Sequence, residues 1–232
     1  MARPRPEAPA ADRPLHRPAS PERGPLSRRA LFAAAAASPV LLSACGGEDE
    51  DEKEEERDAA DLEIVRYLLE IEDVEAAFWR EAESRGSLDS VGVDGEIVAG
   101  VARNEREHVG VLERWVQKLG GDRPRATETA LDDVLAAGPQ EVLSSGASLE
   151  NLSAAAYLGQ INRIQDRNLL ASMVAIHSVE GRQAAAMNRL AGRGFSLGTG
   201  QLEGALPDGA FAEPMEMREV RIRLRRYTGG EP

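Results

Sequence analysis

The chain has 232 residues, of which 40 are acidic and 28 are Lys or Arg, so its formal net charge at pH 7 is −12. A chain of this charge repels phosphate backbones and anionic lipid headgroups, which argues against nucleic-acid binding. Its single cysteine, Cys45, leaves no means of forming an intrachain disulfide or a cysteine-based metal cluster.

Residues 1–44 have the three parts of an export signal. Residues 1–29 contain many Pro and seven Arg, residues 30–44 are apolar, and small residues precede Cys45. The apolar run has 15 residues and is interrupted by Pro39. It is therefore too short to remain as a membrane-spanning helix, which needs about 20 residues.

Two short motifs refine this prediction. Ser27-Arg28-Arg29-Ala30-Leu31-Phe32 resembles a twin-arginine signal, which exports folded proteins, although ordinary signals also carry paired basic residues. Leu42-Ser43-Ala44-Cys45 resembles a bacterial lipobox, in which the cysteine is lipidated and the chain is cut before it. A small buried cysteine is the other interpretation. We expect an exported protein, held on the extracytoplasmic side of a membrane by a lipid on Cys45.

The segment after Cys45 is strongly acidic. Residues 45–232 carry a net charge of −16, and residues 48–58 alone contain nine acids and two bases. Such charge blocks stay solvated and extended. We therefore interpret residues 45–59 as a disordered tether, with a cation-attracting tail as the alternative. Residues 60–228 are long enough to form one domain with its own core.

Beyond the tether, apolar residues recur every three or four positions, as in amphipathic helices. The pattern predicts four long helices over residues 60–84, 94–119, 139–164 and 166–191. Short links make the first and second helices antiparallel neighbours, and likewise the third and fourth. Residues 120–138, with a short helix at 127–136, can return along the bundle. The expected fold is all-α: an antiparallel four-helix bundle with one long crossover. Ile97 and Leu190 are among the residues expected to face inward.

An acidic residue interrupts each apolar stripe near its middle: these are Glu72, Glu105, Glu150 and Glu180. Buried carboxylates are almost always paired or bound to a metal. Mid-helix residues of an antiparallel bundle lie at a similar depth, where four carboxylates would repel one another unless cations lay between them. Glu105 and His108 also form a Glu-x-x-His pair, which projects from one face of its helix. This pattern predicts a metal site in the bundle core.

In combination, these segments resemble the ferritin-like family of exported bacterial and desiccation-associated proteins. The resemblance covers about residues 60–228 and includes a short C-terminal helix. It rests on residues 68–79, 104–108, 149–150, 156–159, 178–183 and 211–214. It implies a di-metal site built from one Glu on each of two helices and a Glu-x-x-His on each of the other two.

Carried over by motif, the resemblance implies a set of metal ligands in the bundle core: Glu72, Glu105, His108, Glu150, Glu180 and Gln183. Gln183 departs from the family pattern, because histidine is expected there and an amide oxygen is a weaker ligand. Three outcomes are open. The second metal binds weakly or is lost, or His177 replaces Gln183, or the site is a remnant held by hydrogen bonds and Arg. His177 is otherwise a boundary residue. Glu75 is a further candidate ligand, because the inward stripe of its helix passes through either Glu75 or Ala76.

The resemblance implies bound iron or manganese. If the protein is an enzyme, it implies di-iron-type oxidase or peroxide-scavenging activity and a role in oxidative stress. The alternative is a metal-free bundle that serves the cell envelope as a structural or partner-binding module. A homodimer through an outer face is left open. The basic residues of the C-terminal helix are expected to dock onto the acidic bundle: Arg218, Arg221, Arg223, Arg225 and Arg226.

Overall fold

The computed structural model describes residues 47–193 and 213–229, so the predicted export signal, the lipobox and Cys45 lie outside the described residues. All regular elements of the described part are helical: α2 (Gly47–Ser84), the short 3-10 helix η1 (Asp89–Val91), α3 (Gly95–Lys118), α4 (Asp132–Ala136), α5 (Pro139–Gln160), α6 (Arg167–Leu190) and α7 (Met217–Thr228). The predicted all-α fold is confirmed. None of the described helices is both long enough and apolar enough to span a bilayer.

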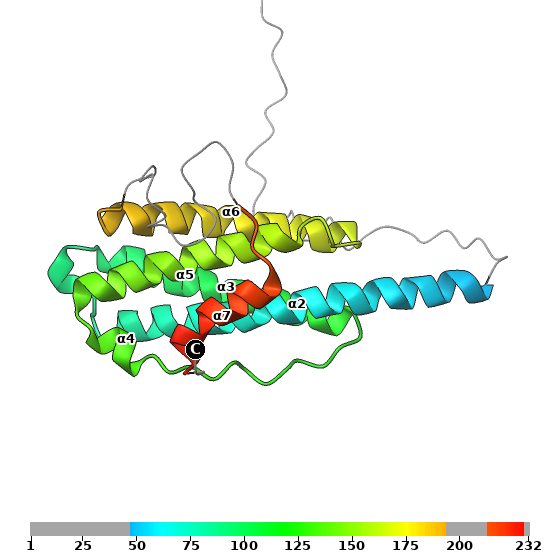
Figure 1. Ribbon diagram of the computed structural model, residues 1–232, viewed down its shortest axis with the longest axis horizontal. Helices are drawn as coiled ribbons and strands as arrows, with labels where there is room; N and C mark the ends of the chain where they lie inside the picture. The colour runs from blue at the N-terminus through cyan, green and yellow to red at the C-terminus, as the bar shows by residue number, and fades with distance from the viewer. Residues whose placement is uncertain (1–46, 194–212, 230–232) are drawn as a thin grey trace, which may run out of the picture. The chain divides into compact units, whose positions relative to one another are not determined.

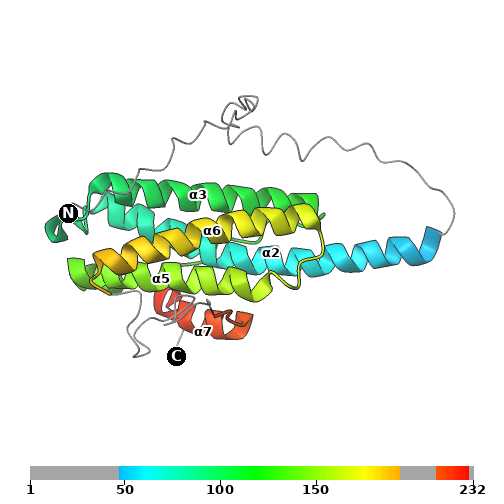
Figure 2. The same ribbon diagram turned by 90° about the horizontal axis from the view of Figure 1, so that it is seen from above.

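Four long helices form two hairpins. α2 packs against α3, and α5 packs against α6, as Figures 1 and 2 show. The crossover between the hairpins contains α4 and is fixed to α2 by Asp73. The carboxylate of Asp73 accepts hydrogen bonds from Arg123 Nη2 at 3.0 Å and from the backbone N–H of Thr127 at 3.1 Å. The predicted arrangement of two hairpins and one long crossover is therefore present.

Helix ends follow the local sequence. Pro139 occupies the first turn of α5, where its missing N–H costs nothing. Asp166 caps α6 by accepting hydrogen bonds from the backbone of Asn168 and Leu169. The turn before it is fixed from α2, because the buried Asp61 accepts hydrogen bonds from the backbone N–H of Gln165 and Asp166 at 2.9 and 2.8 Å.

The acidic segment differs from the predicted disordered tether, because α2 begins at Gly47 instead of residue 60. Residues 52–57 are exposed, as expected for a solvated segment, but they are helical instead of extended. Two effects explain the difference. Glu, Lys and Arg are good helix formers, and acids in the first turns interact favourably with the helix dipole. The packed part of α2 also supplies the nucleus from which the helix extends.

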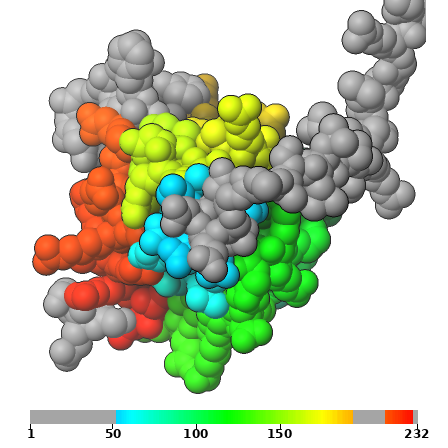
Figure 3. Space-filling view, turned by 90° about the vertical axis from the view of Figure 1, so that its right-hand side faces the viewer, coloured from blue at the N-terminus to red at the C-terminus, as the bar shows by residue number. Residues whose placement is uncertain are grey.

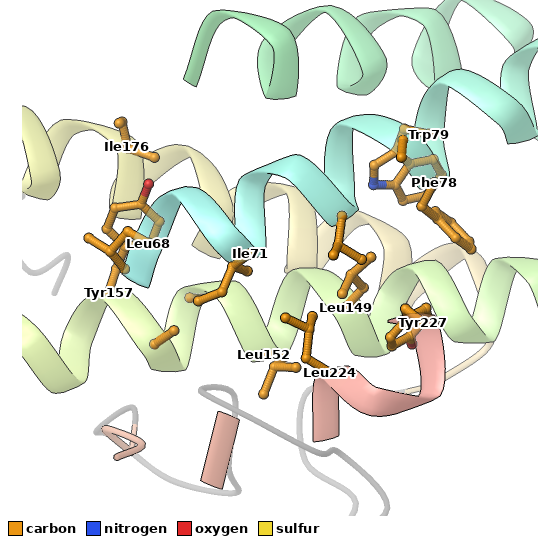
Figure 4. Packing of buried hydrophobic residues seen from close by; sticks show 14 of the residues in the cluster. Leu68, Ile71, Phe78, Trp79, Leu149, Leu152, Tyr157, Ile176, Leu224 and Tyr227 are labelled. Atoms are coloured by element: carbon orange, nitrogen blue, oxygen red, sulfur yellow. The ribbon is translucent and has the colours of Figure 1, made fainter. Parts of the chain in front are cut away.

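Most buried side chains are apolar, and Figure 4 shows part of this core. The Phe78 ring packs edge-to-face on Trp79 and on Tyr227, with centroids 5.1 and 6.1 Å apart. Ile97 and Leu190 were predicted to face inward, but 41% and 39% of their surfaces are exposed. Val98 is buried instead of Ile97, and one position along a helix turns a side chain by about 100°.

The C-terminal helix α7 packs against α5 and α2, and Figure 3 shows it in orange to red beside both on the surface. The Tyr227 hydroxyl donates to the backbone carbonyl of Ser145 over 2.8 Å. At Gly159 a Cβ atom would overlap the carbonyl oxygen of Met215, so glycine is needed for the chain to pass this close to α5. Arg221 pairs with Glu70 through two contacts of 2.8 Å, in line with the predicted docking of the basic helix.

Candidate metal centre

Five glutamates of the described chain are fully buried in the middle of the bundle. Each long helix contributes at least one: Glu72 and Glu75 from α2, Glu105 from α3, Glu150 from α5 and Glu180 from α6. The side chain of His108, one turn after Glu105, is also buried. Residues three apart on a helix project from the same face, which is why Glu72 and Glu75, like Glu105 and His108, reach the same space.

One group of potential ligands surrounds the His108 ring. Its Nδ1 atom lies 2.8 Å from Glu180 Oε1, 3.2 Å from Glu105 Oε2 and 3.4 Å from Glu72 Oε2. One ligand atom from each of these four residues lies within 4.8 Å of all the others. An imidazole and three carboxylates at this separation form a set of nitrogen and oxygen donors suited to a first-row divalent metal.

A second group contains only oxygen donors. One carboxylate oxygen from each of Glu75, Glu150 and Glu180 lies within 4.8 Å of the others. Glu180 belongs to both groups and so lies between them. The arrangement can hold two neighbouring cations with a shared carboxylate.

Three side chains that belong to neither ligand group donate hydrogen bonds to the buried carboxylates. The Tyr157 hydroxyl donates to Glu72 Oε1 and the Trp79 ring Nε1 donates to Glu150 Oε1, both over 2.5 Å. The Trp79 ring can take this position because residue 146 is glycine, where a Cβ atom would lie 2.6 Å from the ring. Such second contacts fix the orientation of metal ligands.

Gln183 is the third of these side chains. Its amide nitrogen donates to Glu105 Oε1 and, over 3.1 Å, to Glu150 Oε2, while its oxygen accepts a hydrogen bond of 2.6 Å from Asn104. Gln183 therefore reaches the centre, as its position in the motif predicts, but it presents N–H groups to carboxylates and not a ligand atom to an ion. Gln183 and Asn104 also line an apolar groove of about 300 Å³ between α3 and α6.

The geometry bears on two of the predicted alternatives. His177 belongs to neither ligand group and its ring is only half-buried, so it does not replace Gln183. The third alternative, a remnant held by hydrogen bonds and Arg, is met in part, because Tyr157, Trp79 and Gln183 donate hydrogen bonds to the glutamates but no Arg of the described residues pairs with them. Within residues 47–193 and 213–229, three of the five buried glutamates form ion pairs, and His108 is the partner of all three: Glu72, Glu105 and Glu180.

Burial and mutual repulsion oppose ionisation of these carboxylates. Burial, followed by the neighbouring charges, raises the pKa of Glu75 and Glu105 well above the usual range, and burial and Glu180 do the same for Glu150. Burial and then Glu72 raise the pKa of Glu180 to about 7, although His108 and Ser153 act against this.

For His108, burial disfavours the charged ring, but the contacts with Glu72, Glu105 and Glu180 outweigh burial and raise its pKa. One imidazolium balances only one of five carboxylates. The donor set therefore has the charge and the chemistry to hold divalent cations.

Sequence reasoning found most of this centre and missed its outer contacts. Glu75 was only a possible ligand, because the apolar periodicity allows either Glu75 or Ala76 to face the core. Trp79 and Tyr157 fit the apolar periodicity of their helices, and nothing in the sequence singles out their donor groups. Asn104 also had no such signal, although it precedes Glu105 directly.

Comparison with known proteins places this centre in a family. No curated protein matches the chain. A family model described as a ferritin-like domain matches residues 60–193, more than half of the chain. The match includes all five buried glutamates, His108 and Gln183. The four-helix bundle and its central carboxylates agree with this match, and the chain therefore belongs to the ferritin-like domain family.

Proposed function

We propose that this protein binds iron or manganese in the core of a ferritin-like bundle that is exported and held at the membrane by a lipid on Cys45. The observation that carries the metal assignment is the convergence of five fully buried carboxylates around one histidine. Burying that much negative charge without a cation is unfavourable, and no Lys or Arg among the described residues pairs with it. Bound iron or manganese would supply redox chemistry toward oxygen or peroxide.

The protein side chains prepare and protect this centre. Tyr157 holds Glu72 Oε1 and leaves Oε2 for an ion, whereas Trp79 and Gln183 each hold one oxygen of Glu150 and fix its orientation. The apolar core around them excludes water and strengthens every electrostatic contact inside. We infer that ions and small oxidants reach the centre through the groove between α3 and α6, because Gln183, one of the residues that line it, touches two of the carboxylates.

Metal analysis of the full-length chain, purified from cells supplied with iron and manganese, tests the metal assignment. We expect at least one ion per chain, and none in the double variant Glu105→Ala, His108→Ala. Arg106→Ala, Glu107→Ala is the matched control, because both residues lie on the exposed side of the same helix. A folded but empty wild-type protein would instead support a metal-free envelope module.

Fractionation of the same cells tests the anchor. The wild-type protein should sediment with membranes, and Cys45→Ser should appear in the soluble fraction. Replacing Arg28 and Arg29 by Lys should leave an uncut precursor inside the cell if the twin-arginine route is used, whereas Arg23→Lys should change nothing. Membrane association of Cys45→Ser equal to that of the wild type would rule out lipidation as the anchor.

A further inference from the structure

The two ligand groups of the centre differ in their donors. The first contains His108, but the second has only the carboxylates of Glu75, Glu150 and Glu180. The residue that would place a second ring nitrogen there is Gln183, and its amide N–H groups already point at Glu105 and Glu150. A cation in the second group therefore has to be held by oxygen alone.

Among the buried glutamates, Glu75 and Glu180 accept no hydrogen bond at either oxygen, and of these two only Glu180 forms an ion pair. Glu72, Glu105 and Glu150 each have an oxygen held by a protein donor, and Glu180 contacts the His108 ring. Neither oxygen of Glu75 receives a hydrogen bond, although its side chain is fully buried. One oxygen of Glu75 lies within 4.8 Å of carboxylate oxygens of Glu150 and Glu180, which repel it unless a cation or a proton lies between them. Buried polar groups without partners are rare and point to an absent ion or water.

We propose that Glu75 ligates the second ion in place of the missing histidine, which creates two unequal subsites: a His108 subsite with nitrogen and oxygen donors, and a Glu75 subsite with oxygen donors only. This inference rests on the proposed metal function. Gln183 is a positioning residue in this arrangement, since it holds Glu105 and Glu150 in place without ligating an ion. All-oxygen sites favour hard cations such as Mn²⁺, whereas imidazole favours Zn²⁺ and iron. The Glu75 subsite should therefore prefer Mn²⁺ over Zn²⁺.

Mn²⁺ titration of the metal-depleted full-length protein, followed by electron paramagnetic resonance, tests the assignment. The wild type should bind two ions per chain and show a magnetically coupled pair, because Glu180 is shared. Glu75→Gln should bind one ion and show the hyperfine pattern of an isolated ion. Glu83→Gln, an exposed residue of the same helix, should behave as the wild type. His108→Gln should retain the Mn²⁺ ion of the Glu75 subsite.

These outcomes distinguish a failure of the Glu75 subsite from a failure of metal binding itself. Two ions in Glu75→Gln, or a single ion in the wild type, would overturn the Glu75 subsite and leave metal binding intact. No ion in the wild type would overturn both. Gln183→His provides a second test that does not depend on the folding of the Glu75 variant. It adds a ring nitrogen beside the oxygen-only subsite and should raise Zn²⁺ affinity there at least tenfold. Unchanged Zn²⁺ affinity would contradict the proposed geometry.

Discussion

Gln183 donates its side-chain amide to Glu150 over 3.1 Å, from the helix position where a second Glu-x-x-His pair would carry its histidine. A histidine at this position could turn its ring toward an ion, whereas the amide of Gln183 faces two carboxylates. Asn104 fixes the orientation of this amide by donating to its oxygen. Through Glu105 and Glu150, Gln183 ties α6 to α3 and α5.

Removing the hydroxyl of Tyr157 should weaken metal binding without unfolding the protein. In Tyr157→Phe the ring still fills the core, but Glu72 loses the donor that fixes its Oε1 atom. Loss of such a contact usually lowers metal affinity about 10- to 100-fold. Competition with a chelator of known affinity measures the change. Tyr67→Phe is the control, since that buried hydroxyl has no hydrogen-bond partner and its loss should be neutral or slightly stabilising.

A methyl group at position 146 should displace the Trp79 ring and so disturb the carboxylate of Glu150. In Gly146→Ala the new Cβ would lie 2.6 Å from the Trp79 ring, which has to move and weaken its bond to Glu150. We expect a loss of about 1–3 kcal/mol in the free energy of unfolding, the usual cost of overpacking. Gly181→Ala has open space around it and should instead stabilise its helix by about 0.5–1 kcal/mol. Urea unfolding followed by tryptophan fluorescence compares the two, and equal effects would contradict this packing.

The metal-depleted protein should be more stable in mild acid than at neutral pH. The pKa of Glu180 is about 7 in the folded state, against 4.5 for an ordinary glutamate, so between these values the folded state binds more protons than the unfolded state. Stability then falls as pH rises, by at most about 1.4 kcal/mol per pH unit for one group.

His108 acts in the same direction, because its pKa is also raised in the folded state and the stability it contributes is lost as pH rises. Thermal unfolding between pH 5 and pH 8, with and without bound metal, checks the sign. Metal should reverse the trend, since ligation displaces protons from the carboxylates and becomes stronger at higher pH. A metal-depleted protein that is more stable at pH 8 than at pH 5 would contradict the burial of ionisable carboxylates described above.

Covering the groove between α3 and α6 should slow metal uptake without lowering the final occupancy. Ala186 is exposed at its edge, and Ala186→Trp places a large ring over the opening. Stopped-flow measurement of metal uptake by the depleted protein gives the rate. We expect a rate at least several-fold lower, with the stoichiometry unchanged. Ala171→Trp, on an exposed part of the same helix outside the groove, should leave the rate unchanged.

The four long helices were predictable because their apolar period is long and regular, and the central glutamates because mid-helix positions of antiparallel helices meet at one level. Finer features depend on three-dimensional contacts. The register that exposes Ile97 and buries Val98 is decided by the rotation of α3 against α2. The helical acidic segment follows from its continuity with the packed part of α2, which a composition rule for charge blocks ignores. The donor roles of Trp79 and Tyr157 appear only when the distances to Glu150 and Glu72 are known.

Because α7 covers α5, the bundle can be completed only after α7 has been synthesised. α5 is buried on nearly every side, and Leu224 and Tyr227 of α7 close the last of them. Because α7 follows the four long helices along the chain, a growing polypeptide can form both hairpins and still expose that apolar face. The bundle is complete only after Tyr227 has left the ribosome. A pathway that carries only folded cargo would therefore have to wait until translation has passed this residue, and a chain truncated before α7 should be retained and degraded.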